Sequence, residues 1–126
     1  WLRVAHSGGR IAYQRAPLVH HRVHDASLTA QPLQLPRGAL RVLEKALREL
    51  QLTHAERAAI EWRMAIINAD LLAEDAKRLL LAGDYRTAHE RMQASAHLVP
   101  TRKRKLAALC IRWTPWLARQ ALQARR

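Results

Sequence analysis

The sequence predicts a mainly α-helical protein with short β segments near its N-terminus. Alanine and leucine dominate the apolar residues and phenylalanine is absent, a composition that favours helices over sheets. From about residue 37 onward, apolar residues recur at the spacing of helix faces. Before that point, glycine and proline separate two short segments that are predicted to be extended. We therefore expect a helical hairpin or bundle that follows a small β region.

Glycine and proline bound the N-terminal elements. Residues 1–7 are predicted to be the last turns of a helix, which the pair at 8–9 closes because glycine takes a positive φ without steric cost. Residues 10–14 and 18–23 are predicted as the two extended segments. A proline separates them, since it disfavours a helical conformation in the residue before it. Residues 25–36 carry turn-forming residues and lead into the helical part.

Two long helices are predicted next. The first begins near Arg37 and runs to about Leu50, with leucines every three or four residues along one face. Thr53 and Glu56 form a capping box for the second helix, which is expected to stop at Gly83. One face of this second helix carries mostly small side chains, which suit close approach to another helix. The residues of that face are Ala55, Ala59, Trp62, Ile66, Ala69, Ala73, Ala76 and Leu80.

Three shorter helices are predicted in the C-terminal part. Asp84 is expected to cap the first of them. The second is basic, and its first turn, residues 102–105, places cations at the positive end of the helix dipole. We expect this turn to fray or to be held by an external anion. Residues 114–115, Thr-Pro, are typical of the cap and first turn of a last helix over 116–124.

Residues 80–100 resemble half of a tetratricopeptide unit, with Gly-Asp-Tyr at the hinge and a proline at the end. The sequence contains one copy of this pattern, whereas a repeat array needs at least about three units to be stable. We therefore interpret the segment as a helical hairpin that uses the same turn.

The composition also limits where the protein works. No apolar run is long enough to cross a bilayer, and no signal peptide is recognisable. The single cysteine, Cys110, excludes an internal disulfide, fits a reducing compartment and is expected to be an inert core residue. We expect a cytoplasmic protein, free or peripheral at a membrane. The chain lacks an initiator methionine and opens inside a helical pattern, so we expect it to be a piece of a longer protein.

The positive charge is concentrated near the C-terminus. Of the net charge of +12, residues 102–126 contribute eight basic residues and no acidic one, which leaves +4 for residues 1–101. Such an excess attracts nucleic acid, anionic lipid or an acidic protein partner, and charge alone does not choose among them. Nucleic acid ranks third, because the sequence carries no recognition motif for it.

Two tryptophans lie within this basic region. Trp113 and Trp116, with the surrounding arginines, could form a membrane-surface helix whose rings lie at the level of the lipid headgroups. They could equally pack on the helical hairpin while the arginines are solvated. The sequence leaves both interpretations open.

Residues 13–29 hold the densest cluster of chemically capable side chains in the sequence. The cluster contains His20, His21, Arg22, His24, Asp25, Ser27 and Thr29. A structural zinc site usually takes four Cys and His ligands at motif spacing, and the only cysteine is remote, so these histidines do not predict zinc. Taken alone, each of these residues is more often a surface or turn residue than a ligand.

The order of the surrounding motifs points to a family. Trp-Leu-Arg-Val-Ala at residues 1–5 is followed by Gly-Arg-Ile-Ala-Tyr at 9–13, Pro-Leu-Val-His-His-Arg-Val-His at 17–24 and Ser-Leu-Thr at 27–29. This series resembles the closing part of the catalytic domain of inverting family-2 glycosyltransferases of the GT-A fold. The resemblance covers about the first thirty residues and, more loosely, the helical tail.

The resemblance implies roles for three residues. Arg22 and His24 match the family's Arg-x-His positions, where the histidine lies near the sugar-nucleotide diphosphate and its divalent metal, sometimes as a ligand of that metal. Ser27 belongs to the turn that follows and is a candidate hydrogen-bond donor to the same diphosphate. An imidazole can complete an oxygen-rich Mn²⁺ or Mg²⁺ site, and a guanidinium can neutralise a departing nucleoside diphosphate. His21 departs from the family's usual aromatic residue before the arginine, which weakens a stacking role at that position.

The sequence therefore favours one function, and a second function stays open as an alternative. Residues 1–36 are interpreted as the end of a GT-A-like catalytic domain and 37–126 as an α-helical extension, basic from about residue 101. The implied parent enzyme transfers a sugar from a nucleotide-sugar donor to an acceptor hydroxyl. The nucleotide-binding half, the Asp-x-Asp metal motif and the catalytic base are expected upstream, so the chain alone is expected to be inactive. The alternative is a non-catalytic, tetratricopeptide-like adaptor that binds an acidic partner or an anionic membrane surface through its basic tail.

Overall fold

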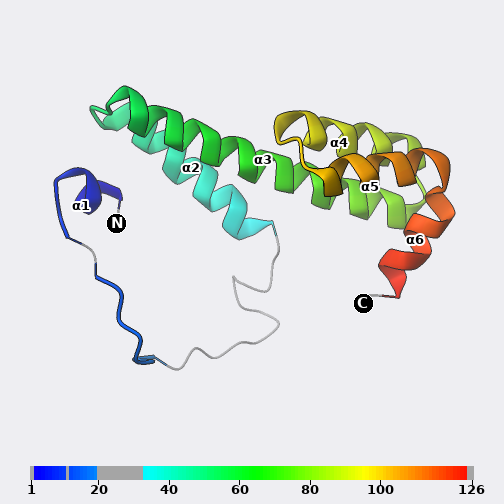
Figure 1. Ribbon diagram of the computed structural model, residues 1–126, viewed down its shortest axis with the longest axis horizontal. Coiled ribbons are helices and arrows are strands. Elements are labelled where there is room, and N and C mark those ends of the chain that lie inside the picture. Colours follow the sequence, from blue (N-terminus) through cyan, green and yellow to red (C-terminus); the bar gives the residue numbers. More distant parts are fainter. Residues whose placement is uncertain (1, 11, 20–32, 125–126) are drawn as a thin grey trace. The chain divides into compact units, whose positions relative to one another are not determined.

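The computed structural model describes residues 2–10, 12–19 and 33–124, and six α-helices lie in these residues (Figure 1). They are α1 (Leu2–His6), α2 (Gln34–Glu49), α3 (His54–Ala82), α4 (Tyr85–Leu98), α5 (Arg102–Trp113) and α6 (Pro115–Gln123). The chain divides into two compact units, Trp1–Ile60 and Glu61–Arg126, and the boundary between them falls inside α3. The prediction of a mainly helical protein is confirmed.

The predicted β segments are not strands in the part of the chain that the structure describes. Residues 12–19 have no regular secondary structure. Tyr13, Leu18 and Val19 are exposed, at 88, 72 and 81% of their surface. An extended segment becomes a strand only when a neighbouring strand takes up its backbone hydrogen bonds, and no other described segment pairs with these residues as a strand. Residues 20–23 of the second segment lie outside the described residues.

Side chains connect the helices of the first unit. Gly8, with φ of +81°, ends α1 as the sequence predicts. The guanidinium of Arg3 donates to a carboxylate oxygen of Glu49 at 2.8 Å, which links α1 to α2. Helix α2 begins three residues before the predicted Arg37 and contains Pro36 in its first turn, where the missing N–H would have no partner in the helix.

Both ends of α3 match the predicted signals. The backbone N–H of Thr53 donates to Glu56 Oε2 at 2.8 Å, and the N–H of Glu56 donates to Thr53 Oγ1 at 3.3 Å, which completes the capping box. At the other end, Gly83 has φ of +92°. Asp84 then caps α4, since its Oδ1 accepts from the backbone N–H of Thr87 at 3.1 Å.

Acidification is expected to weaken these two caps. Hydrogen bonds from Thr53 lower the pKa of Glu56, and hydrogen bonds from Thr87 lower the pKa of Asp84. A carboxylate whose pKa is lower in the folded state stabilises the fold above its unfolded pKa, and the effect is lost as the pH falls through the folded pKa. We expect the free energy of unfolding to decrease below about pH 4, and to decrease less in the E56Q/D84N variant.

Urea unfolding at neutral and acidic pH measures this effect. The E44Q/E61Q variant is the control, because it removes two exposed carboxylates that make no cap. Equal pH dependence in the two double variants would show that the caps do not contribute.

The core of the second unit lies among α3, α4, α5 and α6. Its buried residues are Ala76, Leu80, Ala88, Met92, Ala108 and Ile111. Ala69, Ala76 and Leu80 confirm the predicted small-residue face of α3 within this unit, whereas Trp62 on the same face is 57% exposed. The hydroxyl of Ser95 in α4 donates to the backbone carbonyl of Ala69 in α3 at 2.6 Å, so these helices approach closely.

An internal carboxylate holds the basic first turn of α5. Thr101 caps the helix by accepting from the backbone N–H of Arg104 at 3.3 Å. The guanidinium of Arg104 donates to Asp70 Oδ1 in α3 at 2.5 Å and to the carbonyl of Val99 at 3.1 Å. The sequence predicted fraying or an external anion at this turn, and Asp70 supplies the anion from within the chain.

Candidate functional site

The residues assigned to a site from the sequence lie outside the described residues. Arg22, His24 and Ser27 all fall within 20–32. Within the ranges that the structure does describe, no three His, Cys, Asp or Glu side chains are placed to hold one metal ion. The roles of these three residues at the diphosphate and metal therefore stay a prediction. The features that the structure brings together lie instead on α5 and α6.

Charges in the second unit are segregated between helices. Every acidic residue from Glu61 onward lies on α3, on α4 or in the turn between them, whereas α5 and α6 carry none. Arg104 is the α5 residue that pairs with a carboxylate, Asp70. The other cations of α5 have no carboxylate partner among the described residues. They are Arg102, Lys103, Lys105 and Arg112.

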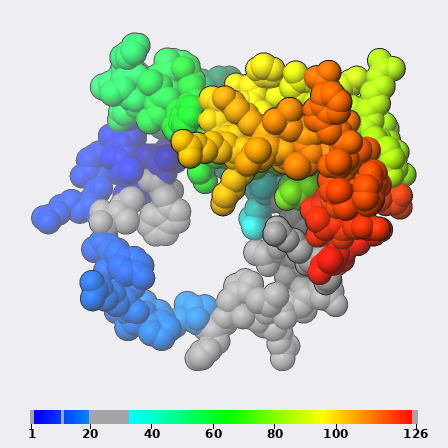
Figure 2. All heavy atoms as spheres, turned by 45° about the vertical axis from the view of Figure 1, so that its right-hand side comes forward, coloured from blue at the N-terminus to red at the C-terminus, as the bar shows by residue number. Residues whose placement is uncertain are grey.

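Five large apolar side chains are exposed on α5 and α6 between residues 106 and 117. We call this set the α5–α6 strip, and it consists of Leu106, Leu109, Trp113, Trp116 and Leu117. On α5 the spacing of three and four residues places its members on one helix face. Figure 2 shows α5 and α6, in orange and red, at the surface of the second unit. Trp113 is 72% exposed and Trp116 57% exposed, which favours the surface interpretation of these tryptophans over packing on the hairpin.

The strip lies opposite the buried face of α5. Ala108 and Ile111 are buried in the core, and at 100° per residue Ile111 lies about half a turn from Leu106. Lys105 and Arg112 lie between the buried face and the exposed apolar face of α5, on the side of the helix that faces α4. Lys103 lies between the same two faces on the opposite side of α5. On α5, the strip is therefore an apolar row with cations on both sides of it.

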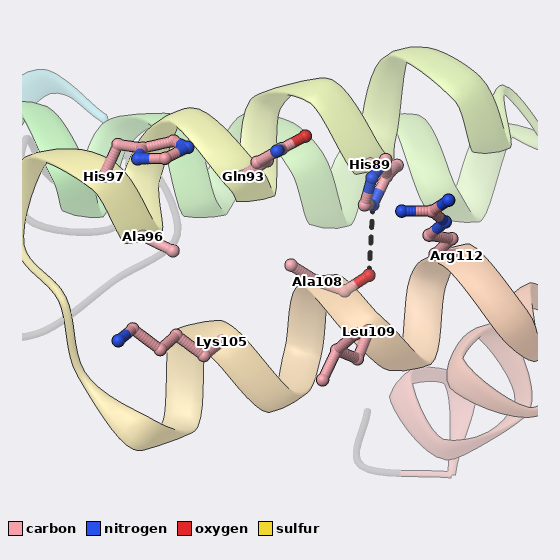
Figure 3. A pocket seen from close by; sticks show the side chains of 8 residues that line it. All are labelled: His89, Gln93, Ala96, His97, Lys105, Ala108, Leu109 and Arg112. Atoms are coloured by element: carbon pink, nitrogen blue, oxygen red, sulfur yellow. Dashed lines mark hydrogen bonds between the residues drawn. The ribbon is translucent and has the colours of Figure 1, made fainter.

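A groove between α4 and α5 runs along one of these edges (Figure 3). Its volume is about 320 Å³, and its lining contains no carboxylate. The lining residues are His89, Gln93, Ala96, His97, Lys105, Ala108, Leu109 and Arg112. Figure 3 shows Arg112 of α5 extending toward His89 of α4. Leu109 and Arg112 connect the groove with the strip, and the Arg112 guanidinium lies 5.5 Å from the centre of the Trp113 ring.

The groove presents Lys105 and Arg112 along its length, whereas one nitrogen of His89 is already hydrogen-bonded. His89 Nδ1 is 3.0 Å from the backbone carbonyl oxygen of Ala108. Because a carbonyl oxygen only accepts, Nδ1 carries the proton of this hydrogen bond and does not donate to an anion in the groove. Lys105 and Arg112 are seven residues apart on one helix, about 10.5 Å along its axis. The two cations are therefore spaced along the groove, an arrangement that can contact several anionic groups at once.

Comparison with protein-family models, curated proteins and solved structures gave no match to this chain. None of the described helices is both long enough and apolar enough to cross a membrane. The sequence analysis identified the cations and the two tryptophans but missed Leu106 and Leu109. The signal that could have found them is their helical spacing with Trp113 in a stretch without acidic residues.

Proposed function

We propose that the chain is the C-terminal part of an inverting family-2 glycosyltransferase of the GT-A fold, followed by an α-helical extension. The observation that carries the proposal is the ordered series of motifs at residues 1–5, 9–13, 17–24 and 27–29. Each motif is short, and their order and spacing together give the resemblance its specificity.

Two features of the described residues support this division of the chain. Helix α1 ends at His6, and Gly8 follows with a positive φ immediately before the Gly-Arg-Ile-Ala-Tyr motif, as expected for the helix that precedes it in the family. Helices then follow one another from Gln34 to Gln123, which fits an extension that begins near residue 37.

In this proposal the parent enzyme transfers a sugar from a nucleotide-sugar donor to an acceptor hydroxyl. Arg22 neutralises charge on the departing diphosphate, because a guanidinium makes paired hydrogen bonds to phosphate oxygens. His24 orients the diphosphate at the edge where the family's divalent metal, Mn²⁺ or Mg²⁺, supplies electrostatic stabilisation when bound. Ser27 contributes a hydroxyl to the same diphosphate. The activity belongs to the longer parent, since the base and the metal motif are assigned to its upstream part.

The test is the H24A variant of the parent protein, assayed for sugar transfer. We expect transfer to fall by at least about a hundredfold, because a charge-stabilising contact made in the transition state is lost. H20A is the matched control, since His20 has no assigned role and its replacement should leave transfer nearly unchanged. Full activity of H24A would overturn the assignment.

The exposed, acid-free surface of α5 and α6 favours a second candidate. A non-catalytic helical adaptor would use this surface to bind an acidic partner or an anionic membrane. The H24A experiment separates the two candidates, since an adaptor keeps its binding when His24 is replaced and has no transferase activity to lose.

A further inference from the structure

We propose that the α5–α6 strip docks this protein onto the surface of an anionic lipid bilayer. The strip would lie in the plane of the interface, with its leucines toward the acyl chains and its tryptophans at the level of the headgroups. This inference does not depend on the glycosyltransferase proposal, because it rests on residues of the second unit alone.

Exposed apolar area is the first argument. The strip exposes five large apolar side chains in succession, from Leu106 at 61% to Leu117 at 45%. Contiguous apolar patches of this kind on a protein surface mark interaction sites, because water-exposed apolar area is unfavourable. Burial in a lipid interface removes that area from water without unfolding any helix.

Charge complementarity is the second argument. Lys105 and Arg112 lie on one side of the strip and Lys103 on the other, and neither helix carries a carboxylate that would repel an anionic headgroup. Each basic residue near an anionic membrane strengthens binding about fivefold. The groove beside Lys105 and Arg112 gives headgroup oxygens access to both cations along its length.

The form of the strip on α5 matches that of helices that lie on a bilayer. The strip lies on the outer face of α5, opposite the core. A convex helix face with cations at its edges and aromatic rings near its end is typical of helices that lie on a bilayer. Helix α5 has twelve residues and α6 nine, lengths that suit lying on a bilayer rather than crossing it.

Vesicle binding of the full 126-residue chain tests the proposal. The probes are vesicles of phosphatidylcholine and of phosphatidylcholine with one third phosphatidylglycerol, and binding is measured by co-sedimentation and by quenching of tryptophan with brominated lipid. We expect binding to the anionic vesicles, weak binding to the neutral ones, and quenching that is lost when Trp113 and Trp116 are replaced by Phe.

Matched variants separate the strip from net charge. K105Q/R112Q should bind about thirtyfold more weakly, whereas R63Q/R78Q, which removes two exposed cations of α3, should bind clearly better than K105Q/R112Q. W116S should bind about tenfold more weakly, and W62S should bind like the unchanged chain, although Trp62 and Trp116 are equally exposed at 57%. Far-UV circular dichroism confirms that each variant is folded.

Three outcomes would overturn the proposal. They are failure to bind anionic vesicles, equal weakening by the α3 and α5 charge variants, and tryptophans that brominated lipid does not quench in the bound state. If the chain binds an acidic protein but does not bind vesicles, the strip is assigned to a protein partner instead. The H24A variant of the parent should dock normally, so a failure of the catalytic proposal would leave this one standing.

Discussion

Replacing Leu80 by alanine is expected to lower the free energy of unfolding by about 2 to 5 kcal/mol. Leu80 is 1% exposed and is one of the largest fully buried side chains of the described residues. It lies in the cluster that joins α3 to α4 and α5, with Met92 and Ile111 among its members. Truncation leaves a cavity in a core otherwise built largely of alanines, whose short side chains cannot move in to fill it.

The control for L80A is the same change at an exposed position. Leu106 is 61% exposed, so L106A should change the free energy of unfolding by no more than about 0.5 kcal/mol. Urea unfolding measures both variants, with the midpoint moving and the slope unchanged if the transition stays two-state. Equal costs for the two variants would show that the core does not lie among α3, α4 and α5.

The ends of the helices could be predicted because their signals are local. The capping box of Thr53 and Glu56, the positive φ of Gly83 and the cap at Asp84 each depend on residues within four positions of one another. Thr114 is a partial exception. Pro115 follows it as the first residue of α6 as predicted, but the Thr114 hydroxyl donates backward to the carbonyl of Cys110 at 3.2 Å.

The orientation of α5 could not be predicted from periodicity, since two of its faces are apolar. One carries Leu106, Leu109 and Trp113, and the other carries mainly small residues such as Ala108. The small face is buried, because the partner helix α4 presents Ala88, which is fully buried, and short side chains let the two helices approach. The larger side chains are left outside. The prediction that Cys110 is a core residue was wrong for the same reason, since it is exposed.

Contacts between distant residues also escaped the sequence analysis. Arg104 pairs with Asp70 across 34 positions, and nothing in the basic run at 102–105 indicates which carboxylate it meets. In the described parts of the segments predicted at 10–14 and 18–23, the prediction of strands was wrong for a related physical reason. A strand is stabilised by the neighbouring strands of its sheet. Its own residues therefore indicate that it can join a sheet, but not whether a partner strand is present. The candidate site at Arg22, His24 and Ser27 stays a prediction, carried by its motifs.

Replacing Ser95 by leucine is expected to destabilise the fold by about 3 kcal/mol. Ser95 is fully buried, and its hydroxyl donates to the carbonyl of Ala69, itself fully buried. Leucine removes a hydrogen bond worth about 1 kcal/mol and adds two further heavy atoms where α4 meets the backbone of α3, at a cost of about 1 to 3 kcal/mol.

The S95A variant separates these two contributions. Alanine fits the same space and loses only the hydrogen bond, so its cost should be about 1 kcal/mol. Urea unfolding of S95A and S95L at neutral pH gives the steric contribution as the difference between them. If both variants cost the same, α3 and α4 have room for a larger side chain at this point, and the small residues of α3 would not be what sets the distance between these helices. A larger cost for S95L would establish that the helix contact at Ala69 and Ser95 tolerates only small side chains.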